Sequence, residues 1–411
     1  MRKVAMTSMM CSLVIALAAT GQAETSNRPG AIKSDELSYQ QEAFKQWWGT
    51  DLLTKVDELP KEGIVPTYRV PYSGHDYPDR SGGTIGAMMK YDRAFNRRPM
   101  AMEYERRDVS AHRDGRDDRP PRRGLFGRII ERYDPVPGWY GHCNGWTAAS
   151  IRHAEPQKSV VRNGVVFTPA DIKAMLAEIY MYSSTEFLGG VDDAINPATL
   201  HLTLGNWLGN GAHPVGMEAA LGEVVINYPI YSYGSTIKDL PNDQVEVKMS
   251  IRYAMNTNRE VDKGPKMNRV MYFHYVLDVD EDRNITGGRY FGDSGRVDML
   301  WTPLKPVQGG KKGNERGNPY LKVDEVLAIW RESVSEDLRK KWLNVDPTEL
   351  DRVLPEEAPA EQPVAESAEP SVERPLAESR DSPRERTQPP PEPRAVPISN
   401  EAAATATAVA M

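Results

Sequence analysis

The chain has 411 residues, a formal net charge of −7 and 39% hydrophobic residues. This acidic balance offers no basic excess for a nucleic-acid surface, and no stretch of the mature chain is apolar enough to span a bilayer. The length allows one large domain or two small ones.

The first 23 residues have the pattern of a secretory signal peptide. Two basic residues precede a short apolar run, which ends in small residues at Gly21 and Ala23. We therefore expect a secreted or periplasmic protein, with a retained N-terminal anchor as the alternative. Cys11 lies in this segment, so that the mature chain would contain one cysteine, Cys143. A lone cysteine in an exported chain is an inert thiol, an intermolecular bridge or a reactive group.

The remaining sequence predicts one mixed domain over residues 24–345 and a disordered tail at 346–411, which is too rich in Pro, Glu and Ala to bury a core. Residues 104–123 interleave both charge signs and predict a solvated insertion. Several alternating runs between 223 and 301 predict an antiparallel sheet. Apolar periodicity and capping residues predict helices at 35–59, 146–152, 169–179 and 321–344.

Cys143 lies in the segment Gly-His-Cys-Asn-Gly-Trp at 141–146. Glycines on both sides allow a tight loop, and the residues that follow predict a helix. The N-terminus of a helix favours a thiolate, and its free N–H groups can hold an oxyanion. Aromatic residues nearby, including Trp139 and Trp146, could exclude water. A buried inert cysteine is the alternative, but such a thiol more often lies in an apolar run, so we predict a nucleophile.

A cysteine nucleophile needs a base and a group that orients the base. His201 is flanked by leucines and predicts a buried element, whereas His274 lies in a predicted strand and is followed by Asp293 after a hairpin. Spacing alone leaves open His201 and a papain-like set of Cys143, His274 and Asp293. We set His75 aside because it lies in a loop rich in Gly and Pro.

The segment around Cys143 resembles the transglutaminase elicitor family, which is known from oomycetes and bacteria. Further segments carry the resemblance in the same order along the chain, over roughly residues 45–305. They are VPYSG at 70–74 with YP at 77–78, FTPADIK at 167–173, NP at 196–197 before His201, EVVINYPIY at 223–231, and the run from 277 to 288.

The resemblance implies an α+β fold with a cysteine-protease-like core, in which the nucleophile helix packs on an antiparallel sheet. It implies protein-glutamine gamma-glutamyltransferase activity, in which Cys143 forms a thioester with a glutamine side chain and a primary amine resolves it. The partners would be a protein or peptide glutamine donor and an amine acceptor. No cofactor and no metal are expected.

The same resemblance favours His201 as the base. It places Asn227 about where such enzymes carry the orienting group, with Glu218 and Glu223 as alternatives. Trp139 and Asn144 are the expected oxyanion or substrate contacts, beside the N–H of Cys143.

The segment that plants recognise in oomycete members differs here at two positions, Ile226 and Tyr228, which argues against elicitor activity. The run Asp278-x-Asp280-x-Asp282-x-Asn284 has the spacing of a calcium loop but lacks its glycine, and a polar hairpin turn explains it better. Two other functions remain open on the same residues: a cysteine peptidase or amidase that uses water as acceptor, and a non-catalytic surface-binding module.

Overall fold

The computed structural model describes residues 30–113, 139–190, 194–222, 224–264, 266–292 and 294–345. They all belong to one unit of the chain, which ends at Val353. The expected signal peptide at 1–23, the second half of the charged insertion and the tail at 346–411 lie outside these ranges. Within them, no helix is both long and apolar enough to cross a membrane.

Eight antiparallel strands of the described ranges form one sheet, in the order β4-β10-β5-β6-β7-β8-β9, with β1 also paired to β6. The predicted antiparallel sheet is therefore confirmed. The strands are β1 (Glu62–Ile64), β4 (Thr185–Gly189), β5 (Val215–Glu218), β6 (Asn227–Leu240), β7 (Gln244–Ala254), β8 (Asn268–Val279), β9 (Ile285–Tyr290) and β10 (Met299–Pro303); β2 (Val160–Arg162) and β3 (Val165–Phe167) form a separate hairpin.

The helices begin and end where the capping residues allow. Thr168 caps its helix by accepting from the N–H of Asp171, whose carboxylate accepts in return from the N–H of Thr168. The first helix ends at Gly49, which has a positive φ, so it is shorter than the predicted 35–59. The helices are α1 (Ser34–Trp48), α2 (Ile85–Tyr91), α3 (Met100–Arg113), α4 (Cys143–Arg152), α5 (Pro169–Tyr180), α6 (Pro197–Thr203), α7 (Val323–Ser333) and α8 (Glu336–Val345).

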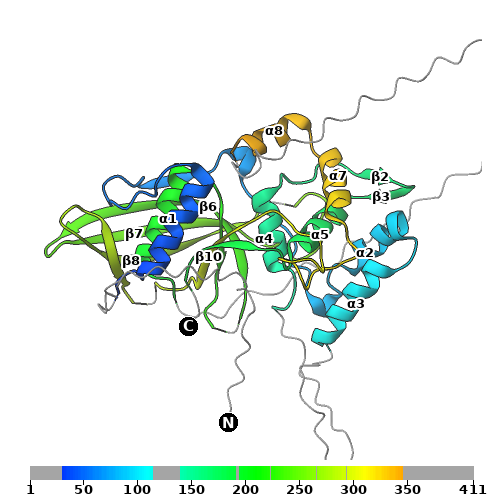
Figure 1. Cartoon of the computed structure of the whole chain (residues 1–411), viewed down its shortest axis with the longest axis horizontal. Helices are drawn as coiled ribbons and strands as arrows, with labels where there is room; N and C mark the ends of the chain where they lie inside the picture. Colours follow the sequence, from blue (N-terminus) through cyan, green and yellow to red (C-terminus); the bar gives the residue numbers. More distant parts are fainter. Residues whose placement is uncertain are drawn as a thin grey trace, which may run out of the picture. The chain divides into compact units, whose positions relative to one another are not determined.

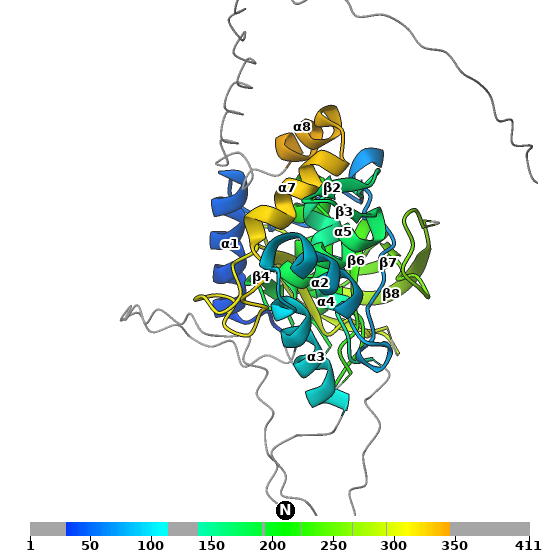
Figure 2. The same cartoon turned by 90° about the vertical axis from the view of Figure 1, so that its right-hand side faces the viewer.

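Two hydrophobic clusters lie at the two ends of this arrangement. One is built on the long strands β6–β8 with α1 and α6, and the other gathers α2, α4, α5 and α7. Figure 1 shows the long strands with α1 over them on one side and α2, α3, α5 and α7 on the other, and in the turned view α4 and α5 lie side by side beneath α7 (Figure 2). Helix α4 packs on α5 and on strands β5, β6 and β10, so it lies where the sheet meets the helices.

The predicted solvated insertion is wrong in its first half. Residues 104–113 form most of α3, because Ala101, Glu105 and Val109 recur on one face of the helix and are buried. This buried face is hard to recognise in the sequence, because one of its residues is a glutamate, Glu105, which the charge pattern would place on the surface.

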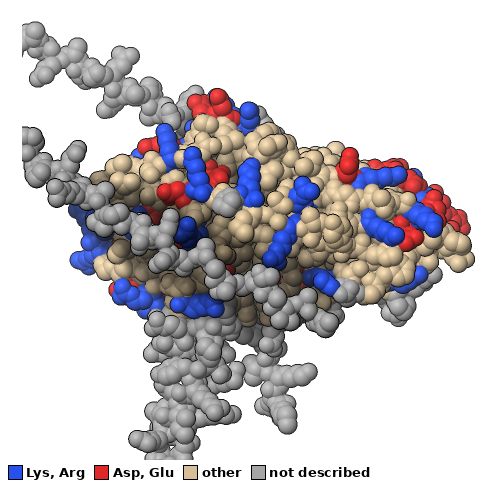
Figure 3. Space-filling view, turned by 180° about the vertical axis from the view of Figure 1, so that it is seen from behind, with Lys and Arg blue, Asp and Glu red and all other residues tan. Residues whose placement is uncertain are grey.

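The calcium-like run forms the turn between β8 and β9, as the hairpin interpretation predicts. Both carboxylate oxygens of Asp280 accept from Asn284, one from its backbone N–H at 2.7 Å and one from its side chain at 2.9 Å. Arg283, with a φ of 70°, donates to Asp57 and Asp239. Seen from behind, the outer end of the sheet carries acidic and basic side chains side by side (Figure 3).

Candidate active site

Cys143 is the first residue of α4, three residues before the predicted start of the helix, and it is partly buried. Helix α4 is held on both sides: Gly145 faces the backbone of Ala177 in α5, and Thr147 Oγ1 donates to the backbone oxygen of Asn227 at 3.1 Å. The second contact fixes the first turn of the helix to the start of β6. The nucleophile helix therefore packs on the antiparallel sheet.

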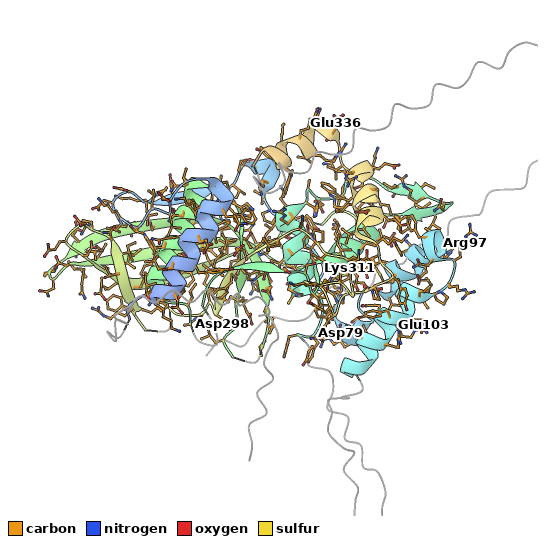
Figure 4. The ribbon with its side chains drawn as sticks, in the orientation of Figure 1. Asp79, Arg97, Glu103, Asp298, Lys311 and Glu336 are labelled. Atoms are coloured by element: carbon orange, nitrogen blue, oxygen red, sulfur yellow. The ribbon has the colours of Figure 1, made fainter. Side chains whose placement is uncertain are left out.

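The loop that precedes Cys143 is paired with a distant segment of the chain. The N–H of His142 donates to the oxygen of Asp76 at 2.6 Å, and the N–H of Asp79 donates to the oxygen of Tyr140 at 3.1 Å. A Cβ on Gly141 would lie 2.6 Å from the oxygen of Asp76, so this backbone approach needs glycine. Figure 4 labels Asp79 on the helical side of the fold. Residues 76–79 are thereby held against the nucleophile.

Residues at and just before the start of β6 hydrogen-bond to the thiol of Cys143. It donates to the oxygen of Val225 at 3.6 Å, and it accepts from Nδ2 of Asn227 at 3.6 Å. The oxygen of the Asn227 side chain accepts from Nε1 of Trp301 at 2.9 Å. An asparagine side chain of β6 is thus placed between the sulfur and a buried indole.

The expected low thiol pKa is not found. Burial raises the pKa of the Cys143 thiol above its ordinary value, although the side chain and backbone N–H of Asn227 and the backbone N–H of Asn144 act in the opposite direction. The nearby charge of Asp76 also raises it. The helix N-terminus supplies donors to the sulfur, as expected, but the desolvation of a thiolate in this pocket outweighs them. The thiol therefore needs a base at the moment of attack.

A small pocket of about 180 Å³ opens beside the thiol. One carboxylate lines this pocket, that of Asp76, whose side chain is about one-third exposed. The other lining residues are mostly apolar or aromatic: Trp139, Trp146, Val225, Ile226, Tyr228 and Asn256. An apolar wall with one carboxylate suits a reaction that must exclude bulk water and move a proton.

The two residues predicted to contact the oxyanion or substrate behave differently. Trp139 lines the pocket and stacks on Tyr140 with ring centroids 4.4 Å apart. The side chain of Asn144 is engaged elsewhere, because its Nδ2 donates to the oxygen of Met181 at 2.7 Å and its Oδ1 accepts from the N–H of Gly145. Asn144 therefore contacts the sulfur through its backbone N–H and not through its side chain.

The structure does not bring His201 to Cys143. His201 is 2% exposed in α6, and its Nδ1 lies 2.7 Å from the hydroxyl of Tyr275. Burial lowers the pKa of His201 from 6.5 to about 4. The predicted role of Asn227 was to orient this histidine. Its side chain instead contacts Cys143 and Trp301. The assignment of His201 as base stays a prediction that no contact in the described ranges supports.

His274, the histidine of the alternative base set, has its contacts elsewhere in the described residues. Nε2 of His274 contacts Glu246 Oε1 at 2.8 Å, and its ring packs against Phe291. Asp293 and Glu223 lie outside the described residues. Glu218 is buried in β5, where it is paired with Asn227 in the strand register.

Sequence reasoning missed Asp76 as a site residue. It lies between VPYSG at 70–74 and YP at 77–78, two segments that carry the family resemblance without an assigned role. The preceding His75 lies next to it, with Nδ1 3.4 Å from Asp76 Oδ1 and 2.9 Å from the oxygen of Thr257. A carboxylate between two recognised segments was the available signal, but nothing in the spacing showed that residue 76 meets residue 142.

A second cluster of ionisable groups lies directly behind the nucleophile. Nε2 of His142 is 2.9 Å from Glu178 Oε2 and 3.5 Å from Glu105 Oε1, and all three side chains are buried. Although burial opposes it, the two carboxylates raise the pKa of His142 to about 10, and burial raises the pKa of Glu105 to about 7. The same three residues have donor atoms close enough together to ligate a metal. In the structure they form an ion-paired cluster that joins α3, α4 and α5.

Comparison with known proteins agrees with the resemblance seen in the sequence. The family model described as transglutaminase elicitor matches residues 131–190, the segment that contains Cys143 and α5. No curated protein matches the chain. The structure is similar to the crystal structure of the GP42 transglutaminase from Phytophthora sojae, with a TM-score of 0.59 and 22% identity over 74% of this chain and 98% of that one. The chain therefore carries the transglutaminase elicitor signature around its cysteine and has the mixed α and antiparallel β fold of the GP42 transglutaminase.

Proposed function

We propose that the protein is an exported acyltransferase of the transglutaminase type, with Cys143 as its nucleophile. One observation carries the proposal: a lone thiol at the start of a helix shares a small apolar pocket with a carboxylate, Asp76, and receives an N–H from Asn227. Nucleophile, proton acceptor and oxyanion donor are the three groups that acyl transfer requires.

Asp76 is the proposed base. It lines the pocket with the thiol, and its negative charge acts on the Cys143 pKa. Since the oxygen of Thr257 can only accept, the proton on Nδ1 of His75 is directed to it, and the same nitrogen lies 3.4 Å from Asp76. The bond to Thr257 thus fixes the ring of His75 next to the carboxylate of Asp76. His201, the base that the family resemblance favours, is kept as the alternative that mutation tests.

The reaction has two halves. Cys143 sulfur attacks the side-chain carbonyl of a glutamine as Asp76 takes the thiol proton, and the proton passes to the leaving nitrogen, which departs as ammonia. A primary amine then attacks the thioester carbonyl, Asp76 takes a proton from the amine, and that proton returns to the departing sulfur. The oxyanion of each tetrahedral intermediate would accept from Nδ2 of Asn227 and from free backbone N–H groups at the start of α4.

The pocket wall favours an amine over water as the second reactant. Trp139, Trp146 and Tyr228 surround the thiol with aromatic surface, which limits the access of bulk water to a thioester. A hydrolase would use the same nucleophile and base with a wetter pocket. A cysteine peptidase or amidase is therefore the second candidate, and it differs only in which acceptor reaches the intermediate.

The test is amine incorporation. The mature protein is incubated with a casein-type glutamine donor and a labelled primary amine, with and without iodoacetamide, beside Cys143→Ala and Asp76→Asn. We expect label in casein for the wild type alone, and loss of about a hundredfold or more for Asp76→Asn. Ammonia release without label would identify the hydrolase instead. The absence of both labelled casein and ammonia release with folded wild-type protein would favour the non-catalytic binding module.

A further inference from the structure

We infer that Trp301 is a positioning residue of the active site, which fixes the side-chain amide of Asn227 so that its N–H rather than its oxygen faces Cys143. This inference deepens the proposed function and rests on Cys143 being its reactive group. Trp301 has no contact with the sulfur among its described hydrogen bonds and acts through Asn227.

The orientation of the amide follows from the chemistry of its two neighbours. An indole Nε1–H can only donate, so the atom of Asn227 that lies 2.9 Å from it must be the oxygen. The other end of the amide, Nδ2, is then directed to Cys143 Sγ at 3.6 Å. A flipped amide would set two N–H groups against each other at Trp301 and would turn an oxygen toward the sulfur, where it would oppose a thiolate or an oxyanion.

The surroundings hold this arrangement in place. Asn227 is 3% exposed, and its backbone oxygen accepts from Thr147 Oγ1, so its main chain is fixed to the nucleophile helix. Trp301 is 2% exposed in β10 and is paired with Gly216 of β5. A Cβ at Gly216 would lie 2.6 Å from Cε2 of the indole. The missing side chain at residue 216 therefore makes the room that the ring of Trp301 occupies over β5.

Trp301→Phe removes the donor and keeps an aromatic ring. The chain offers a matched control in Trp330→Phe, because Trp330 is also a largely buried tryptophan whose Nε1 donates at 2.9 Å, in its case to the oxygen of Ala154. Both variants lose one buried indole hydrogen bond, but only one of them loses it at Asn227. Among the described residues, the titratable groups that face Cys143 are Asp76 and Tyr228, and neither is altered.

The readout is the pH dependence of alkylation by iodoacetamide, followed on the peptide that carries Cys143 in the full chain. Without Trp301, the amide is free to turn its oxygen to the sulfur. A hydrogen bond to a charged group is worth about 1.5 kcal/mol, so we expect Trp301→Phe to raise the alkylation midpoint by about one pH unit. Trp330→Phe should leave the midpoint where it is. An unchanged midpoint in Trp301→Phe, or an equal shift in the two variants, would overturn the inference.

Two further variants separate positioning from general damage. In an Asn227→Ala background, Trp301→Phe should shift the midpoint no further, because the group through which it acts is gone. If Trp301→Phe does not yield folded protein, Asn227→Asp is measured instead. Both ends of an aspartate side chain are acceptors, so its alkylation midpoint should exceed that of Asn227→Ala. Equal midpoints in these two variants would refute the role of amide orientation. Alkylation does not depend on transfer, so a shifted midpoint without amine incorporation would refute the proposed function and leave Trp301 as positioning residue.

Discussion

His201 gives the sharpest test of which residue serves as the base. In the structure it is a buried neutral histidine that holds Tyr275, whereas the family resemblance makes it the proton acceptor of Cys143. These two roles predict opposite outcomes for His201→Gln, a replacement that keeps a polar side chain of similar length. If the role is structural, the variant loses stability and keeps its rate. If the role is catalytic, it loses its rate and keeps its stability.

The magnitude follows from two terms. Removal of the 2.7 Å contact between His201 Nδ1 and the Tyr275 hydroxyl leaves a buried group poorly paired, at a cost of about 1–3 kcal/mol. At roughly 2–4 °C per kcal/mol for a domain of this size, the melting temperature at pH 7.5 should fall by a few degrees to about ten.

The second term is the pH dependence. Burial lowers the pKa of His201 from 6.5 to about 4, so the unfolded state binds its proton first as the solution is acidified. Stability is therefore lost between pH 6.5 and pH 4, by at most about 3.4 kcal/mol for a shift of 2.5 units. His201→Gln cannot lose stability in this way. Its deficit relative to the wild type should shrink as the pH falls from 7.5 to 4.5.

Thermal unfolding at the two pH values and amine incorporation at pH 7.5 make the measurement. His274→Gln is the control, because His274 is a histidine with a partly exposed side chain whose solvent-screened pair with Glu246 contributes little to stability. We expect His201→Gln to keep its transfer rate within a few-fold. A hundredfold fall in kcat with an unchanged melting temperature would refute this reasoning, restore His201 as base and remove Asp76 from that role.

Three further predictions test the rest of the site. The alkylation midpoint of wild-type Cys143 should lie above the ordinary thiol value of 9.0, because burial raises its pKa; a midpoint below about 8.5 would contradict the desolvated pocket. Gly141→Ala should lower the melting temperature and the transfer rate, since its Cβ would meet the backbone oxygen of Asp76 at 2.6 Å and overpacking costs about 1–3 kcal/mol, while Gly86→Ala, which meets no neighbour, should do neither. The carboxylates around His142 hold its pKa at about 10, above its ordinary 6.5, so its contribution to stability is complete below pH 6.5 and is lost as the pH rises to 10. The melting temperature of His142→Gln should therefore change less with pH over that range than that of the wild type. Parallel curves for the two proteins would show that His142 is not ionised.

Cys143 could be singled out from the sequence as the candidate nucleophile because its signal is local. A helix start, two glycines and a lone cysteine fall within six residues, and the helix predicted from residue 146 begins three residues earlier, at Cys143. The antiparallel sheet could be predicted for a similar reason, since alternation and turns are properties of neighbouring residues. The fold class and the position of Cys143 at a helix N-terminus were thus within reach of the sequence.

The partners of the nucleophile were not within reach, because they come from distant segments. Asp76 reaches Cys143 through backbone pairing between residues 76–79 and 140–142, which involves no side-chain pattern. The histidine and Asn227 were assigned by order along the chain, which does not report on distance in space. The amphipathic face of α3 was concealed because Glu105, which reads as a surface residue, is buried beside His142.

The raised thiol pKa and the converging N–H groups fit one catalytic logic. In the resting protein, burial penalises a thiolate more than the donors of Asn144 and Asn227 favour it, so the sulfur keeps its proton and donates it to the oxygen of Val225. In the proposed reaction, a carboxamide carbon takes the electron pair of the sulfur, and the negative charge moves to the substrate oxygen. Donors that are already oriented stabilise that charge without any reorganisation, and because Trp301 and Thr147 hold Asn227, the stabilisation is greatest where the charge develops. A site built in this way would react slowly with small alkylating agents and faster with a bound glutamine, and it would protect a lone cysteine from oxidation outside the cytoplasm.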